Sequence, residues 1–170
     1  LTSCGGAEFF MNISKIVAGG LKGGPAKIAV IGSALMGMIT GATVANVATT
    51  GSVTIPMMKR SGYDPHFAGA VEALASSGGQ LMPPIMGAAA FVMIDYLNLS
   101  YSQLVIHAIV PALLYFYSVL LIVHVRSVKE GFTAIPKSEI PKAGDELRQR
   151  GHMILPIVVL VILLTQRYGV

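Results

Sequence analysis

An uncharged stretch of the chain runs from Ile28 to Met58 and contains no Asp, Glu, Lys or Arg. As one straight helix its 31 residues would extend roughly 46 Å, whereas the hydrocarbon core of a bilayer is about 30 Å thick. The middle of the stretch is rich in Gly, Thr, Ser and Asn. We therefore predict a re-entrant helical hairpin over residues 25–63, with arms over about 26–39 and 44–58. Both of its ends carry basic residues, namely Lys22, Lys27, Lys59 and Arg60.

The alternative interpretation of this stretch is one tilted or kinked transmembrane helix, whose small residues would serve helix packing. A hairpin turn at membrane depth has a further implication. Irregular backbone is tolerated there only where it is buried in protein or lines a cavity, so the turn itself predicts a site.

Hydrophobic runs and helix breakers divide the rest of the chain into further elements. Pro83 and Pro84 interrupt an apolar segment, because proline lacks an amide donor and disfavours helical geometry in the residue before it; we expect the second half-helix to begin at about Pro84. The predicted elements are an amphipathic or partly buried helix with a Gly-rich link (1–24), a broken transmembrane helix (64–97), a transmembrane helix (101–126), a loop (127–151) and the truncated start of another transmembrane helix (152–170).

Composition supports an all-α integral membrane protein. Of the 170 residues 54% are hydrophobic and only 12% are charged, and the mean hydropathy is +0.70. The single Cys4 excludes an internal disulfide framework and a cysteine metal cluster. We see no signal peptide, and both ends of the sequence suggest a piece of something longer.

The basic residues give a check on topology. If the hairpin returns to its own side and the next two segments cross, ten of the twelve Lys and Arg residues lie on one side of the membrane. The positive-inside rule makes that side the cytoplasm, with Asn98 facing the periplasm and Arg167 the only basic residue opposite. A single span over residues 28–58 would separate the basic residues at its two ends, so the charge pattern favours the hairpin.

Three runs carry a resemblance: GGPAKIAVIGSALMG, TGATVANVATTGSVTIPMMKRSGY and FAGAVEALASSGGQLMPPIMGAAAF. They resemble the large membrane subunit (DctM-like) of tripartite ATP-independent periplasmic (TRAP) transporters, and are most similar to its fused-permease, TAXI-associated branch, over roughly residues 1–130. The resemblance implies an elevator-type fold of two inverted repeats, of which this chain supplies one. It also implies sodium symport of small organic acids.

The same resemblance implies partners and a location. The partners are a periplasmic solute-binding protein, the remainder of the permease (its second repeat and small-subunit portion) and the lipid bilayer, with no nucleic acid. The location is the cytoplasmic (inner) membrane of a bacterium or archaeon, spanned several times. No cofactor is implied beyond the sodium ion.

The resemblance further implies that the hairpin tip and the helix break form a sodium site and one wall of the substrate site. The expected sodium-site residues are Thr40, Gly41, Asn46, Thr50, Gly51 and Gly78. The expected substrate-site residues are Ala42, Thr43, Gly79, Gln80, Pro83 and Pro84. The family usually has Ser-Gly-Ser at the tip, whereas this sequence has Thr-Gly-Ala, so the hydroxyl at the third position is missing.

The positions of the carboxylates in the sequence also favour sodium over a proton as the coupling ion. No carboxylate occurs between Ile28 and Met58 or between Ala73 and Ile94, so a cation there must be held by neutral oxygens, whereas a proton needs a titratable group. Glu72 is the one candidate for proton coupling, and an ionisable residue in a membrane segment is a functional hypothesis by default. It could instead lie near the interface and pair with a basic residue.

Other polar residues have simpler interpretations. Asn46 could merely cap or cross-link helices, His107 and His124 suit packed or interfacial positions, and no transition-metal site is indicated. A membrane enzyme would need an acid, base or nucleophile set that the sequence lacks, and an assembly subunit would not need two polar, glycine-rich breaks. We therefore expect a transporter subunit and not an enzyme, with a proton-coupled transporter using Glu72 or a non-transporting assembly subunit as alternatives.

Overall fold

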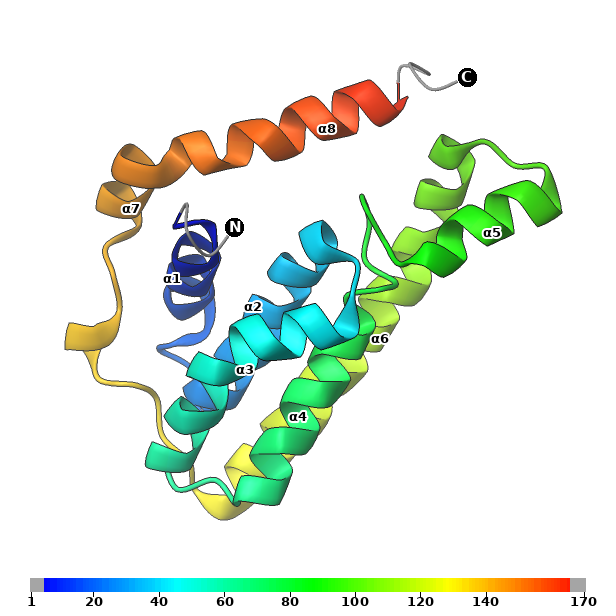
Figure 1. The fold of residues 1–170 in the computed structure, drawn as a ribbon. Coiled ribbons are helices and arrows are strands. Elements are labelled where there is room, and N and C mark those ends of the chain that lie inside the picture. Colours follow the sequence, from blue (N-terminus) through cyan, green and yellow to red (C-terminus); the bar gives the residue numbers. More distant parts are fainter. Residues whose placement is uncertain (1–4, 166–170) are drawn as a thin grey trace.

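The computed structural model describes residues 5–165 and contains no strand within that range. Cys4 and Arg167 lie outside the described residues. In chain order the helices are α1 (Gly6–Ala18), α2 (Gly24–Thr40), α3 (Thr43–Arg60), α4 (Pro65–Gly78), α5 (Ala88–Leu97), α6 (Tyr101–Glu130), α7 (Ala143–Arg150) and α8 (Leu155–Thr165). Figure 1 shows α2, α3, α4 and α6 packed side by side, with α1 beside α2 and with α7 and α8 along one side of this bundle.

Helices α2 and α3 form a tight hairpin (Figure 1). The first arm starts after Gly23, has Pro25 in its first turn and ends at Gly41; a proline there loses no helical hydrogen bond. Gly41 has a φ of 59°, and an ideal Cβ on it would overlap the carbonyl oxygen of Met86. Both the backbone conformation and the lack of space therefore require glycine at the turn.

The interrupted segment separates α4 from α5. Asp64 caps α4 by accepting the amides of His66 and Phe67, at 2.9 and 3.1 Å. The expected start of the second half at Pro84 is wrong, because α5 begins at Ala88. Residues 79–82 form tight turns, in which each amide donates to the carbonyl three residues earlier, and the helix does not resume at once because Pro83 and Pro84 have no amide to donate.

Two backbone hydrogen bonds fix the end of this break. The Ile85 amide donates to the Met38 carbonyl of α2 at 3.3 Å, and the Gly87 amide donates to the Gln80 carbonyl at 2.9 Å. Met86, between them, has a φ of 58°, which a helix cannot accommodate. The break is thus joined directly to the first arm of the hairpin.

Helix α6 is the long element of the fold. A capping box between Ser100 and Gln103 starts it, and Gly131, with a φ of 74°, ends it. Its 30 residues extend about 45 Å, and within residues 5–165 it is the one helix both long and apolar enough to cross a bilayer. It continues four residues past the predicted end at 126.

Small side chains let the four central helices approach closely. The core between α2, α4 and α6 is built largely from alanine and valine, with one aromatic side chain from α6. Such small residues are typical of helix interfaces in membranes. The buried members from these three helices are Ala26, Ala29, Val30, Ala34, Ala68, Val71, Ala75, Phe116, Val119 and Val123.

The segment predicted as a plain loop over 127–151 is more ordered than expected. It contains α7, whose first turn is acidic and whose last turn is basic, an arrangement that the helix dipole favours. The connection before α7 also packs on α1 and α2: Ile135 is 6% exposed, its amide donates to the Gly19 carbonyl at 3.0 Å, and the Gly23 amide donates to the Phe132 carbonyl at 3.3 Å.

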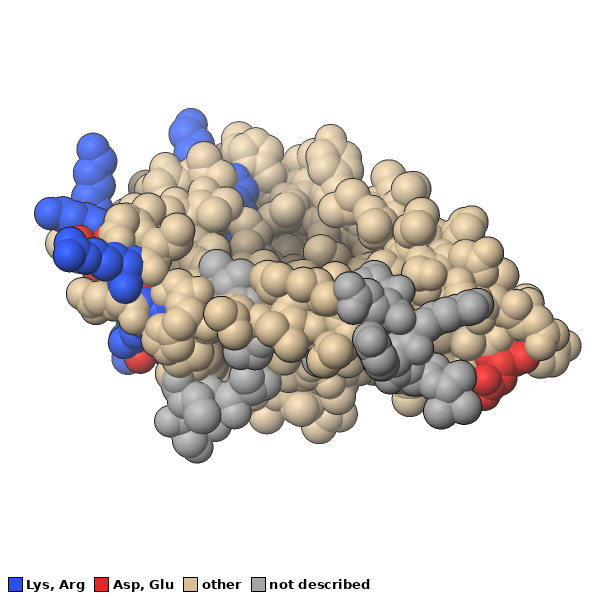
Figure 2. All heavy atoms as spheres, turned by 90° about the horizontal axis from the view of Figure 1, so that it is seen from above, with Lys and Arg blue, Asp and Glu red and all other residues tan. Residues whose placement is uncertain are grey.

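Charges separate along the molecule. Figure 2 shows the visible Lys and Arg side chains gathered at the end where α7 lies, whereas the opposite end shows only acidic ones. Uncharged surface lies between the two ends (Figure 2). The uncharged stretches of the sequence thus form the middle of the molecule in this view, and the charged residues that are visible lie at its ends (Figure 2).

Candidate functional site

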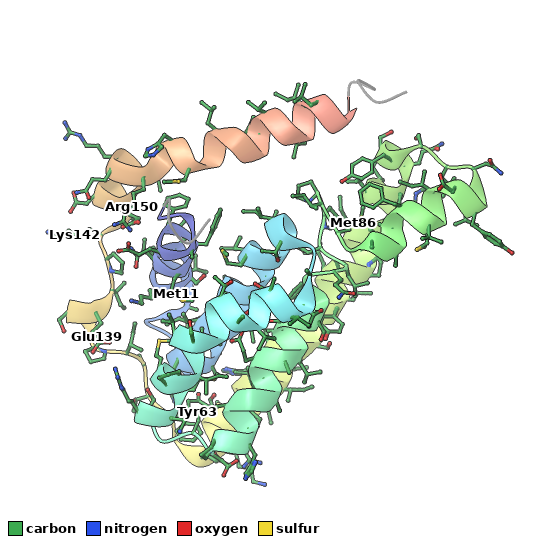
Figure 3. All side chains as sticks on the ribbon, in the orientation of Figure 1. Met11, Tyr63, Met86, Glu139, Lys142 and Arg150 are labelled. Atoms are coloured by element: carbon green, nitrogen blue, oxygen red, sulfur yellow. The ribbon has the colours of Figure 1, made fainter. Side chains whose placement is uncertain are left out.

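The hairpin turn and the helix break contact each other directly. An ideal Cβ on Gly79 would lie only 2.7 Å from the Cα of Gly37, so the two backbones meet without side chains between them. The Gln80 Nε2 atom donates to the Thr43 hydroxyl at 2.7 Å, which joins the break to the first residue of α3. Figure 3 labels Met86 beside this turn and Tyr63 at the opposite end of α4.

Asn46 occupies the junction between these elements. Its side chain is fully buried, and its Nδ2 atom donates to the Ser33 carbonyl at 2.8 Å and would lie 3.5 Å from a Cβ on Gly79. Its Oδ1 atom is buried and has no hydrogen-bond partner among the described residues, and the same is true of the Thr40 hydroxyl oxygen. Buried polar atoms usually have a partner in protein or ordered water, so these two oxygens on either side of the turn are available to a water or an ion, as is the buried Tyr101 hydroxyl at the start of α6.

A second buried polar group is centred on Glu72. The carboxylate is fully buried, and the four hydroxyls around it are at most 2% exposed. Its Oε1 atom accepts from Ser33 at 2.7 Å, from Thr50 at 2.5 Å and from Ser76 at 3.0 Å, while Thr54 bonds to Oε2. We call Glu72, Ser33, Thr50, Thr54 and Ser76 the Glu72 cluster. None of the ion pairs within residues 5–165 includes Glu72, so pairing with a basic residue is not what holds it.

The predicted sodium-site residues fall into three places. Thr40, Gly41 and Asn46 flank the hairpin turn. Thr50 belongs to the Glu72 cluster, and Gly51 packs against it, since an ideal Cβ on Gly51 would lie 3.1 Å from the Glu72 Cγ. The structure thus joins them to Asn46 through the Thr50 hydroxyl, which lies 2.8 Å from the Asn46 carbonyl.

Gly78 is the predicted sodium-site residue that lies apart from the others. An ideal Cβ on it would be 2.9 Å from the Phe116 ring of α6, and its carbonyl accepts the Leu81 amide at 3.0 Å. Its close packing against α6 accounts for the glycine without any ligand. Its role as an ion ligand stays a prediction.

The predicted substrate-site residues lie around the turn and the break. Ala42 and Gln80 are exposed, Thr43 and Pro83 are half-buried, and Gly79 and Pro84 are buried. Ala42 precedes α3 and provides no side-chain cap, so the first amides of this 18-residue helix lack the side-chain acceptor that caps many helices. Such a helix end favours anions. The assignment to substrate stays a prediction.

Sequence reasoning missed three members of the Glu72 cluster: Ser33, Thr54 and Ser76. A signal was present, because Asn46, Thr50 and Thr54 recur every four residues and Ser76 follows Glu72 by four. Residues four apart share a helix face. These two polar faces in apolar segments were the available signal for a polar contact between α3 and α4, which we did not predict from the sequence.

An interrupted helix whose break packs against a second irregular turn is typical of the binding sites of ion-coupled membrane transport proteins. The profile of one family, described as "Tripartite ATP-independent periplasmic transporter, DctM component", matches residues 1–168. The chain belongs to this family, which confirms the resemblance. It is a family of transporter permeases and not of enzymes.

Curated relatives of the chain carry names that agree with this family. The chain is 29% identical over 164 residues to the C4-dicarboxylate TRAP transporter large permease protein DctM of Pseudomonas aeruginosa, covering 95% of this chain and 37% of that protein. It is 22% identical over 161 residues to the sialic acid permease protein SiaM of Vibrio cholerae, with the same coverage of 95% and 37%. It is 39% identical over 75 residues to the isethionate permease protein DctMQ of Oleidesulfovibrio alaskensis, covering 44% and 12%. The chain thus spans about a third of the length of the first two.

Proposed function

We propose that this chain is part of a secondary active transporter that imports small organic acids by sodium symport, using a periplasmic solute-binding protein. The chain would supply one inverted repeat of an elevator-type permease, and the remainder of the permease would supply the second repeat and the small-subunit portion. The complex would lie in the cytoplasmic membrane of a bacterium or archaeon, with the Lys- and Arg-rich segments in the cytoplasm. Three features of the structure support this proposal.

The first is the shape and charge of the hairpin. Its arms have 17 and 18 residues, so each extends about 26 Å, just under the hydrocarbon thickness. The basic residues Lys59 and Arg60 end α3, and Lys22 precedes α2, whereas the turn at Gly41 carries no charge. A re-entrant hairpin explains why both outer ends are basic.

The second feature, which carries the sodium assignment, is the pair of unpartnered oxygens. The Asn46 Oδ1 and Thr40 Oγ1 atoms are buried, neutral and without a hydrogen-bond partner in the described part of the chain. Neutral oxygens at a break between half-helices suit a sodium ion. The Asn46 amide nitrogen is already engaged by Ser33, so its oxygen is the atom left for a cation.

The third feature concerns the substrate. The start of α3, around Ala42 and Thr43, has no side-chain cap, and Gln80 lies beside it. Backbone amides at a helix start attract carboxylates. The names of the relatives mention C4-dicarboxylate, sialic acid and isethionate, all of which are anions. A small organic acid therefore fits this end of α3.

The test is uptake by the full-length transporter reconstituted in vesicles, with sodium and pH gradients imposed separately. We expect a sodium gradient alone to drive uptake, and Asn46→Ala to raise the sodium concentration for half-maximal uptake. The alternative is a proton-coupled transporter that uses Glu72, which the buried, unpaired carboxylate favours. Uptake driven by the pH gradient alone and abolished by Glu72→Gln would establish that alternative; no uptake under either gradient would point to a non-transporting assembly subunit.

A further inference from the structure

The carboxylate of Glu72 connects three helices at one point. Ser33 comes from α2, Thr50 and Thr54 from α3, and Ser76 from the same helix as Glu72, α4. All the contacts to Oε1 are 3.0 Å or shorter. A buried carboxylate is costly unless hydrogen bonds compensate it, so the hydroxyls must stay in place while the carboxylate is there.

Glu72 depends on the hydroxyls of Thr50 and Thr54 for its hydrogen bonds, whereas these two hydroxyls do not depend on Glu72. Thr50 and Thr54 each have a second acceptor in their own helix, the carbonyls of Asn46 and Thr50 at 2.8 and 3.0 Å. Without Glu72 these hydroxyls would still find partners, whereas Glu72 without them would not. Both hydroxyl oxygens already lie within hydrogen-bond distance of the carboxylate and of their own-helix carbonyls, so the carboxylate determines to which acceptor each hydroxyl proton points.

Two members of the cluster continue directly to Asn46. The Ser33 residue that donates to Glu72 through its hydroxyl also accepts the Asn46 side-chain amide through its carbonyl, at 2.8 Å. Thr50, which donates to Glu72, lies one helical turn after Asn46 on the same face. Glu72 thus acts on both the side chain and the backbone around Asn46 without touching the Asn46 Oδ1 atom.

We propose that Glu72 is a positioning residue: by holding Ser33 and Thr50 it fixes the Asn46 side chain, so that the Asn46 oxygen faces the ion site at the hairpin turn. This inference rests on the proposed sodium function. It assigns Glu72 a role in sodium affinity that requires its hydrogen-bonding shape and not a change in its charge.

The substitution Glu72→Gln removes the negative charge of the side chain but keeps its size and its hydrogen-bonding geometry. In Glu72→Gln the amide oxygen accepts from Ser33, Thr50 and Ser76 as Oε1 does, and the amide nitrogen donates to Thr54, whose own proton goes to the Thr50 carbonyl 3.0 Å away. These four contacts stay in place, and one of the two amide N–H groups is left without an acceptor in the cluster. Glu72→Ala removes all four contacts.

The experiment measures the sodium concentration for half-maximal uptake, and the maximal rate, in the reconstituted full-length transporter. We expect Glu72→Ala and Thr50→Val to raise that concentration about tenfold, the order expected when a hydrogen bond to a charged group is lost, with a smaller effect on the maximal rate. Glu72→Gln should stay within about threefold of the wild type, because it restores the shape. If Glu72→Ala does not reach the membrane, Ser33→Ala decides, because it removes the Ser33 hydroxyl bond to Glu72 at a residue outside the expected sodium site and keeps the backbone carbonyl that holds Asn46.

A neighbouring residue gives the matched control. Thr49 is next to Thr50, but its hydroxyl bonds to its own helix, at the Ala45 carbonyl, and faces away from the cluster. Thr49→Val should leave sodium affinity unchanged. Equal effects of Thr49→Val and Thr50→Val, or a loss in Glu72→Gln as large as in Glu72→Ala, would overturn the positioning role.

If the proposed sodium symport is wrong, the outcome differs from the one that refutes the positioning role of Glu72. A wild-type transporter whose uptake ignores sodium refutes the proposed function, and the positioning role is then decided by stability. Thr50→Val should lower the thermal midpoint more beside the native Glu72 than in the Glu72→Gln background, because the loss of a donor costs a buried carboxylate more than a neutral amide oxygen. Equal losses in the two backgrounds would refute it.

Discussion

Adding one methyl group at Gly79 should separate the helix break from the hairpin. An ideal Cβ there would be 2.7 Å from the Gly37 Cα and 3.1 Å from the Ser76 carbonyl oxygen, whereas ordinary contacts are at 3.4 Å or more. Both neighbours are backbone atoms, so no side chain can turn aside. Gly79→Ala therefore requires the two backbones to move apart by up to about 1 Å, and overpacking of this kind costs about 1–3 kcal/mol.

A matched glycine lies ten residues earlier. Gly69, in the interior of α4, has no atom within 4 Å of an ideal Cβ, so Gly69→Ala should be neutral or should stabilise the helix by up to about 1 kcal/mol through its propensity. The two variants add the same atom to the same segment. Their difference in the free energy of unfolding should be about 1–4 kcal/mol.

The assay is the thermal midpoint of the detergent-solubilised full-length permease, together with sodium-driven uptake. Gly79→Ala should lower the midpoint and reduce uptake, because the shift that relieves the contact with Gly37 displaces the break from the hairpin arm on which the Asn46 side chain packs. Gly69→Ala should do neither. Equal midpoints and equal uptake in the two variants would refute the close contact between the break and the hairpin.

Two further predictions concern topology and the break. Cysteines placed at Lys22 and Lys59 should both be inaccessible to an impermeant maleimide applied outside intact spheroplasts, and one at Asn98 should react; labelling at 59 but not at 22 would exclude a re-entrant hairpin. The double substitution of Pro83 and Pro84 by Ala should preserve expression but abolish uptake, because helix propensity would then compete with the irregular break. Normal uptake by this double variant would show that the prolines do not shape the site.

Local signals made the helix ends predictable. Pro25 and Gly41 act through their own backbones, and the observed arms, α2 and α3, extend the expected ones by one or two residues at each end. The break at Pro83 followed from the same chemistry. Its extension to Gly87 did not, because it depends on a bond from Ile85 to Met38, residues far apart in the sequence.

Individual residues of the candidate site could be predicted from the sequence, but the hydrogen bonds between them could not. The sequence pattern indicates that Asn46 and Glu72 are unusual at membrane depth, since each is a polar side chain in an apolar segment. Which hydroxyls meet the carboxylate depends on how α2, α3 and α4 pack, and Ser33 lies 39 residues from its acceptor. No local rule specifies a contact over that separation.

The connection between α6 and α7 has a practical consequence for anyone who fuses a reporter to this protein. Its prolines and charges resemble those of a tolerant insertion site, yet Phe132 and Ile135 bond to the backbone near α1 and α2, and Ile135 is buried. An inserted tag there would pull an interior side chain out of place. Even between the exposed Glu139 and Lys142 the permissive window is narrow, because Ile140 packs against the same apolar cluster as Ile135.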